Sequence, residues 1–157
     1  MAQVAQFSRN IRKRGRQVVN SASRAVRSSA KGALRGVIDA TPVDTGEARS
    51  NWRVGVGAAP TAVIEPYSRY PKGSKANGAG RGERANAGAA YSVGASRIDS
   101  VRGVSGVGLK TAIFIVNNTR QIGFLNAGSS SQAPGGFIQA AFSGARESLR
   151  GFRLFDR

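Results

Sequence analysis

The sequence contains no cysteine and no histidine, and it has only 8 acidic residues against 24 Lys and Arg in 157 positions. Without these two residue types there is no disulfide, no thiolate nucleophile, no imidazole base and no Cys/His zinc site. Most hydrolase mechanisms are therefore excluded. No apolar run reaches the roughly 18 residues of a membrane span, and no apolar stretch of signal-peptide length follows the first cations. We expect no membrane partner, and assembly of the protein in a cytoplasm.

The few groups that could carry chemistry have simpler interpretations. Residues 103–111 resemble a phosphate-binding loop, but Leu109 separates the framing glycine from Lys110, and a strand is expected next in place of a helix. Asp44 and Glu47 form a close pair of acids, and their spacing fits the start of a short helix with Asp44 as the N-cap. We predict no enzyme activity, no catalytic residue, no cofactor and no metal.

Positive charge is concentrated in residues 1–38, which hold nine cations and no acid. At about 100° per residue the large apolar side chains of this segment share one side of a helix, and eight of the nine cations lie opposite; Arg14 is the exception. We predict a basic amphipathic helix over 1–40, ended by the proline at position 42. The predicted partner-contacting or DNA-contacting face comprises Arg9, Arg12, Lys13, Arg16, Arg24, Arg27, Lys31 and Arg35.

This helix is too long for the domain that carries it. It would extend on the order of 50 Å, whereas a compact chain of this size has a radius of gyration near ~15 Å. Either the helix breaks, at Gly15 or at Asn20–Ser21, or part of its apolar face packs on another subunit. Three roles of the charged face stay open: binding nucleic-acid phosphates, binding an acidic protein surface, or simple solvation.

The remaining sequence predicts one α+β domain over 1–157, with an antiparallel sheet of about four strands flanked by a long N-terminal helix and a C-terminal helix. Residues 41–66 are predicted to hold a turn and a hairpin, in which Trp52–Val56 pairs with Thr61–Ile64. Residues 109–157 are predicted to hold the clearest strand, at Thr111–Val116, its return strand at Gln121–Leu125, and a last helix that begins near Pro134 and covers the sheet. The predicted core contains Trp52, Ile113, Ile115, Phe137 and Phe142.

Between these parts, residues 67–108 are rich in Gly, Ala and Arg. Glycine makes up 21 of the 157 residues of the chain, nearly twice the usual ~7%. Few large aliphatic side chains are present to offset the entropy of ordering, so the segment is predicted to be a mobile loop with at most a weak helix over 84–102.

Several short stretches together resemble the tail-completion, or neck, proteins of tailed double-stranded DNA phages. The first is Thr-Pro-Val-Asp-Thr-Gly at 41–46, followed by a polar segment that reaches Trp52. The others are Ile-Phe-Ile-Val-Asn-Asn at 113–118, Gly-Phe-Leu-Asn-Ala-Gly at 123–128 and Gln-Ala-Pro-Gly-Gly-Phe at 132–137. They follow the family's order over most of the chain. The family-motif turn consists of Thr41, Pro42, Val43, Asp44, Thr45 and Gly46.

The resemblance implies a non-enzymatic virion protein that assembles as a homo-oligomeric ring, expected to be a hexamer, in the phage neck. Its expected partners are neighbouring connector, terminator or tail proteins and, through the basic face, double-stranded DNA in the channel. The residues independently agree, because an overlong amphipathic helix and a polar loop leave surfaces for neighbours in a closed ring to cover. The alternative is a free-standing basic nucleic-acid-binding protein.

Overall fold

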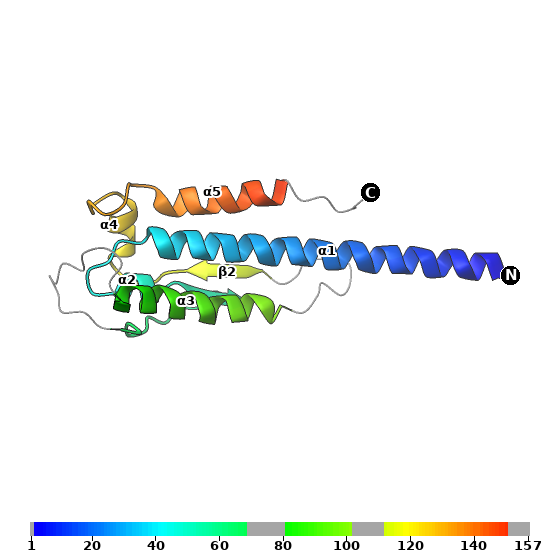
Figure 1. Cartoon of the computed structure of the whole chain (residues 1–157), viewed down its shortest axis with the longest axis horizontal. Helices are drawn as coiled ribbons and strands as arrows, with labels where there is room; N and C mark the ends of the chain where they lie inside the picture. Colours follow the sequence, from blue (N-terminus) through cyan, green and yellow to red (C-terminus); the bar gives the residue numbers. More distant parts are fainter. Residues whose placement is uncertain (1, 69–80, 102–111, 151–157) are drawn as a thin grey trace.

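The computed structural model describes residues 2–68, 81–101 and 112–150. The helix α1 (Ala2–Ala40) is a central rod, with α5 (Phe137–Arg150) lying along one side and α3 (Arg81–Asp99) with the strands along the other (Figure 1). Both flanking layers cover only the half of α1 nearer its C-terminal end, so the N-terminal half projects alone (Figure 1). The elements are α1 (Ala2–Ala40), α2 (Glu47–Ser50), β1 (Arg53–Val56), α3 (Arg81–Asp99), β2 (Ile113–Val116), α4 (Ile122–Asn126) and α5 (Phe137–Arg150).

The N-terminal helix does not break. Its 39 residues run without interruption through Gly15 and Asn20–Ser21, and at about 1.5 Å per residue they span roughly 58 Å. The helix ends at Ala40, two residues before Pro42, which confirms the predicted end. The predicted break at Gly15 or Asn20–Ser21 is therefore wrong, and packing of the apolar face on another subunit stays a prediction.

The core lies around the last turns of α1. Trp52 and Phe137 are buried as predicted, with 4% and 3% of their surface exposed, while Ile113 and Ile115 of β2 pack against the core and are partly buried. Side chains from α1, β1 and α3 meet there because the C-terminal half of α1 is the part flanked on two sides. The buried members are Leu34, Val37, Ile38, Trp52, Val54, Ala90, Ile98, Ala133 and Phe137.

The predicted four-strand sheet is wrong. The described residues are mostly helical, and they contain one two-strand sheet in which β1 pairs antiparallel with β2, from Arg53↔Val116 to Val56↔Ile113. The partner of β1 is thus a strand some sixty residues away along the chain. Neither predicted hairpin forms, for two different local reasons.

The first hairpin fails because a side chain takes the place of a strand ladder. Thr61–Ile64 passes beside the start of β1, but Ile64 is held by the Asn51 side chain: the Ile64 amide donates to Oδ1 at 2.7 Å, and Nδ2 donates to the Ile64 carbonyl at 2.8 Å. The segment therefore lies against β1 without forming a strand of its own.

The second predicted hairpin fails at Asn117. Its Oδ1 accepts hydrogen bonds from the amide and the hydroxyl of Thr119, at 3.1 and 2.7 Å, and its Nδ2 donates to the Ala48 carbonyl at 2.7 Å. These bonds direct the chain away from the sheet. The return strand predicted at 121–125 is replaced by the short helix α4, which covers Ile122–Asn126.

The segment predicted as a mobile loop contains a 19-residue helix, α3. The mobile-loop prediction was wrong for 81–99, whereas the weak helix allowed over 84–102 is present and begins earlier than expected. Small residues can contribute to packing by letting backbones approach. A methyl group at Gly94 would lie 2.6 Å from Cδ2 of Leu34 and 3.0 Å from Cγ2 of Val54, so α3 lies very close to α1 and β1. The parts of the predicted loop at 69–80 and 102–108 lie outside the described residues.

The last helix packs on α1, and it does not cover the sheet as predicted. Gly36 of α1 faces Ala141, and the Ser29 hydroxyl donates to the Ala145 carbonyl at 2.6 Å. Phe142 was predicted in the core, but 41% of its surface is exposed. The correction follows from helix geometry, since Ala141 and Ala145 occupy the contact line and Phe142 lies one position around from it. The helix begins at Phe137, so Pro134 precedes it.

Candidate functional site

The stretches that carry the phage resemblance meet at the C-terminal end of α1. The Gln132 side chain binds both backbone groups of Val43: the Val43 amide donates to Oε1 at 3.0 Å, and Nε2 donates to the Val43 carbonyl at 3.0 Å. The two residues are 89 positions apart. We call this region, residues 41–52 with 117–138 and Asn86, the motif cluster.

Further bonds lie within and between the two halves of the motif cluster. Nε1 of Trp52 donates to the Thr41 hydroxyl at 2.6 Å, and Nε2 of Gln121 donates to the Glu47 carboxylate at 3.0 Å. The Arg49 guanidinium donates to the Thr41 carbonyl at 2.6 Å. Amides and hydroxyls that hold backbone groups in this way stabilise a fold, and they leave Glu47 engaged in a structural contact.

Asn86 is the member of the motif cluster that sequence reasoning missed. Its side chain is fully buried, its Oδ1 accepts from the Ser50 hydroxyl at 3.0 Å and from the Ser68 amide at 2.6 Å, and its Nδ2 donates to the Ser68 carbonyl at 2.8 Å. The surrounding Gly/Ala-rich sequence offered no signal of a buried amide. Asn86 was therefore assigned to a mobile loop with at most a weak helix.

Two observations explain why the last residue of the family-motif turn, Gly46, is a glycine. Its φ of +83° is a left-handed conformation that favours glycine, and a side chain there would collide with Nδ2 of Asn86. Gly46 is also the N-cap of α2, so the prediction that Asp44 occupies the N-cap position is wrong. The remaining motif residues Thr41, Pro42 and Val43 are buried, while Asp44 is exposed.

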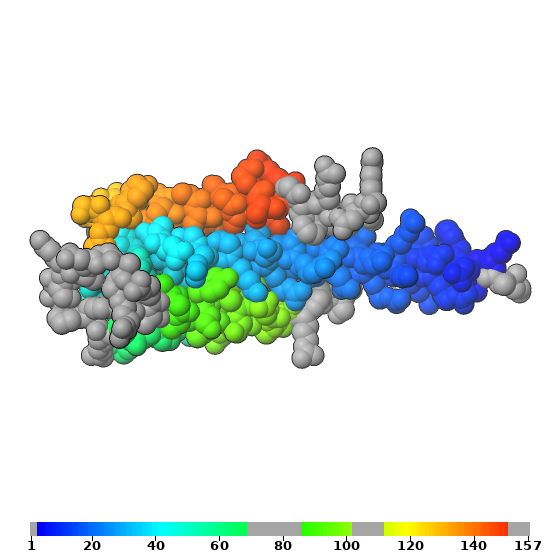
Figure 2. Space-filling view, in the orientation of Figure 1, coloured from blue at the N-terminus to red at the C-terminus, as the bar shows by residue number. Residues whose placement is uncertain are grey.

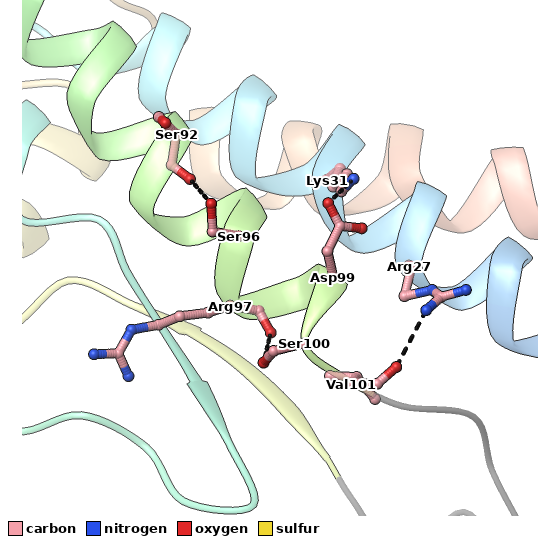
Figure 3. Close-up of polar contacts among 8 residues, drawn as sticks. All are labelled: Arg27, Lys31, Ser92, Ser96, Arg97, Asp99, Ser100 and Val101. Atoms are coloured by element: carbon pink, nitrogen blue, oxygen red, sulfur yellow. Dashed lines mark hydrogen bonds and ion pairs between the residues drawn. The ribbon is translucent and has the colours of Figure 1, made fainter.

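The predicted basic face separates into two groups. Arg27, Lys31 and Arg35 hold α3 and the residues after it to α1: Nη1 of Arg27 donates to the Val101 carbonyl at 3.2 Å, and Nζ of Lys31 lies 2.6 Å from Oδ2 of Asp99 (Figure 3). Arg35 lies with its guanidinium carbon 4.8 Å from the centre of a tyrosine ring, that of Tyr91. The sequence could not separate these cations, because Asp99 is 68 residues from its partner.

The second group of cations is exposed to solvent, as is Arg14, which was not part of the predicted face. Arg9, Arg12, Lys13 and Arg16 are exposed on the projecting half of α1, and Arg24, also exposed, bonds the hydroxyl of Ser21. Residues 3–17, which we call the arm, have every side chain exposed and extend beyond the other described elements (Figure 2).

The arm also exposes apolar side chains. Val4, Phe7 and Ile11 leave 69%, 66% and 54% of their surface in solvent. An isolated exposed apolar residue is ordinary, but three on one side of one helix form a stripe that favours contact with another molecule.

The described residues include no group of three His, Cys, Asp or Glu placed to hold a metal ion. In the same described part of the chain, no helix is long and apolar enough to cross a membrane. Comparisons with protein-family models, with curated proteins and with solved structures found no match.

Proposed function

We propose that this chain is a non-enzymatic structural protein of a phage virion, located in the neck, where its copies form a hexameric ring that completes the tail or joins it to the head. The observation that carries the proposal is the motif cluster. Stretches that resemble the tail-completion family at 41–52, 113–118, 123–128 and 132–137 lie apart in sequence, yet they contact one another through specific hydrogen bonds.

The bonds explain why those residue types belong to one pattern. Thr41 receives the indole of Trp52, and Gly46 makes room for Asn86. Asn126, which stands where the family usually has a Glu, holds the start of the last helix: its carbonyl accepts from the Gly136 amide at 2.7 Å, and its side chain accepts from the Ile138 amide at 3.0 Å. A set of residues with mutually dependent partners supports a shared fold better than any one of the short stretches does.

The surfaces left open suit a subunit of an assembly. The arm has no cover among the described residues, and Phe124 of α4 leaves 70% of its surface exposed at the opposite end of α1. Phe142 and Leu149 on α5 are each 41% exposed. Heterologous contacts that close by rotation into a ring cover two different surfaces of each copy.

The positive charge of the chain also supports a location in the phage neck. With 24 cations and 8 acids, each copy attracts acidic neighbours and the phosphates of DNA. A ring at the joint between head and tail would offer both, because DNA passes through its channel.

The test is to disrupt the gene for this chain in a phage that encodes it, and to examine the lysate by electron microscopy. We expect full heads and free tails that do not join, with joined particles restored by the wild-type gene supplied in trans. Mass spectrometry of purified wild-type particles should detect the chain. Normal joined particles from the disrupted phage, or wild-type particles without the chain, would contradict the proposal.

A free-standing nucleic-acid-binding protein is the second candidate, and one observation favours it. Five cations, Arg9, Arg12, Lys13, Arg14 and Arg16, are exposed on the arm, whose residues 3–17 include no acid. If they neutralise five phosphates, log Kd for a duplex should change with log salt by roughly 4 to 5 units per decade. A flat salt dependence, or no binding of a random-sequence duplex at low salt, removes this candidate.

A further inference from the structure

We propose that the arm binds in an apolar groove of an acidic neck protein, with a carboxylate of that protein against Arg14. This inference rests on the proposed function, and it names the class of partner that one surface of the chain would bind.

The apolar stripe of the arm has the spacing of a helix that lies in a groove. Val4, Phe7 and Ile11 occupy positions i, i+3 and i+7, the pattern by which an amphipathic helix places anchors in a hydrophobic groove. All three are more than half exposed, and α3 and α5 end before they reach this part of α1 (Figure 1). The arm is already helical, so binding would not require the chain to order first.

The position of Arg14 restricts the class of partner that the arm can bind. Seven residues bring an α-helix within about 20° of two full turns, so Arg14 follows Phe7 on the same side, roughly 10 Å further along. The other four arm cations, Arg9, Arg12, Lys13 and Arg16, lie away from the stripe. A groove that accepts Phe7 must therefore also accept a guanidinium, which would be costly to bury without an anionic partner.

A second copy of this chain fits poorly. Two arms paired through their stripes would bring Arg14 near Arg14 or near other cations of the partner copy. The chain has few acids to offer, and three of those described are already in ion pairs: Asp99 with Lys31 at 2.6 Å, Asp39 with Arg35 at 3.1 Å and Glu147 with Arg150 at 2.6 Å.

DNA or a lipid surface would each contact only the cations or only the apolar stripe of the arm. DNA would neutralise the cations but would leave Val4, Phe7 and Ile11 in water. A lipid surface would take the apolar residues, but the stripe extends only about 10 Å before Arg14 interrupts it. A groove with an acid at its end uses the stripe and Arg14 together.

The first experiment places a photo-crosslinking amino acid at position 7 of the chain, and separately at position 9 on the opposite face of the same helix. Both proteins are supplied to a phage whose own gene is disrupted, and purified particles are irradiated. We expect position 7 to cross-link to one defined peptide of a different virion protein, beside Asp or Glu, and position 9 to give much less of that product. Cross-links from position 7 to another copy of the chain, or to no protein, would overturn the inference.

The second experiment compares a variant of the apolar stripe with two variants that carry the same charge reversal at different positions of the arm. Phe7→Ser and Arg14→Glu should each lower the copies of the chain per particle at least about tenfold, as loss of an interface anchor does, whereas Arg9→Glu should change them less than about twofold. Equal losses for Arg14→Glu and Arg9→Glu, with Phe7→Ser unaffected and with parallel losses of binding to a random-sequence 30-base-pair duplex, would assign the arm to DNA and overturn the inference.

Lipid is tested with vesicles of phosphatidylcholine and phosphatidylglycerol. Flotation of the wild-type chain but not of Phe7→Ser, together with no protein cross-link from position 7, would assign the stripe to a lipid surface and also overturn the inference. The proposed function fails separately, if the wild-type chain is missing from purified particles. When the wild-type chain is present, a negative cross-link counts against the groove alone.

Discussion

The Thr41 hydroxyl joins the end of α1 to the core. It accepts a hydrogen bond from the indole of Trp52 and donates one to the Val37 carbonyl of the last turn. Thr41 has no exposed surface and Trp52 has 4%, so both polar groups are satisfied away from water. The family-motif turn is thus built around a buried tryptophan, and its cost of disruption should be that of a core residue.

Trp52→Ala should lower the free energy of unfolding by about 3 to 5 kcal/mol, because it removes a large buried side chain and leaves the Thr41 hydroxyl without its donor. Phe142→Ala, at an aromatic residue 41% exposed on α5, should cost about 1 kcal/mol. Urea denaturation at one fixed protein concentration measures both. Equal costs for the two variants would show that the core is misplaced.

Asn86→Asp tests the buried amide of the motif cluster. The change keeps the size of the side chain, removes the donor to the Ser68 carbonyl and places a carboxylate in a fully buried position, so we expect a loss of at least about 2 kcal/mol. Asn10→Asp, the same change on the exposed arm, is the matched control and should stay within about 0.5 kcal/mol. Comparable losses at the two sites in thermal or urea unfolding would contradict the assigned role of Asn86.

At the scale of elements, α3 depends on close approach more than on large side chains. Gly94 lies where α3 meets Leu34 of α1 and Val54 of β1, whereas nothing lies within 4 Å of a methyl group built at Gly88 of the same helix. The two glycines therefore separate helix propensity from packing.

Gly94→Ala should destabilise the protein by about 1 to 3 kcal/mol, because overpacking at the contact outweighs the gain in helix propensity. Gly88→Ala should stabilise it by up to about 1 kcal/mol, since alanine favours the helix and meets no neighbour. Equilibrium unfolding and far-ultraviolet circular dichroism distinguish the outcomes. Stabilisation by both changes would mean that α3 does not approach α1 as closely as described.

Elements with their own local signal were predictable. The amphipathic pattern of 1–40 and the proline after it predicted α1 and its end, and the β-branched run at 113–116 predicted β2. The pairing of β2 with β1 was not, because Asn117 and Asn51 replace hairpin geometry with side-chain bonds to distant backbone groups. The helix α3 was expected only as a weak helix over 84–102, because its stability comes from contacts with α1 and β1, which its own composition does not encode.

At the scale of the whole molecule, the chain is asymmetric. One half of α1 lies between two layers and carries the core, while the arm in the other half extends beyond the other described elements (Figure 2). The arm carries five exposed cations and an apolar stripe. The excess length of the helix was predictable from the sequence, as was the concentration of charge. The division of the basic face was not, because Arg27, Lys31 and Arg35 find their partners only once α3 folds against α1.

We propose that neighbouring molecules cover the surfaces that a single copy leaves open, and a reconstruction of the neck in intact phage particles by electron cryomicroscopy tests this most directly. We expect a closed ring of six copies around the channel, with each arm bound in a neighbouring protein other than this chain. A neck that lacks this chain, or copies that stand singly with the arm in contact with nothing, would contradict it.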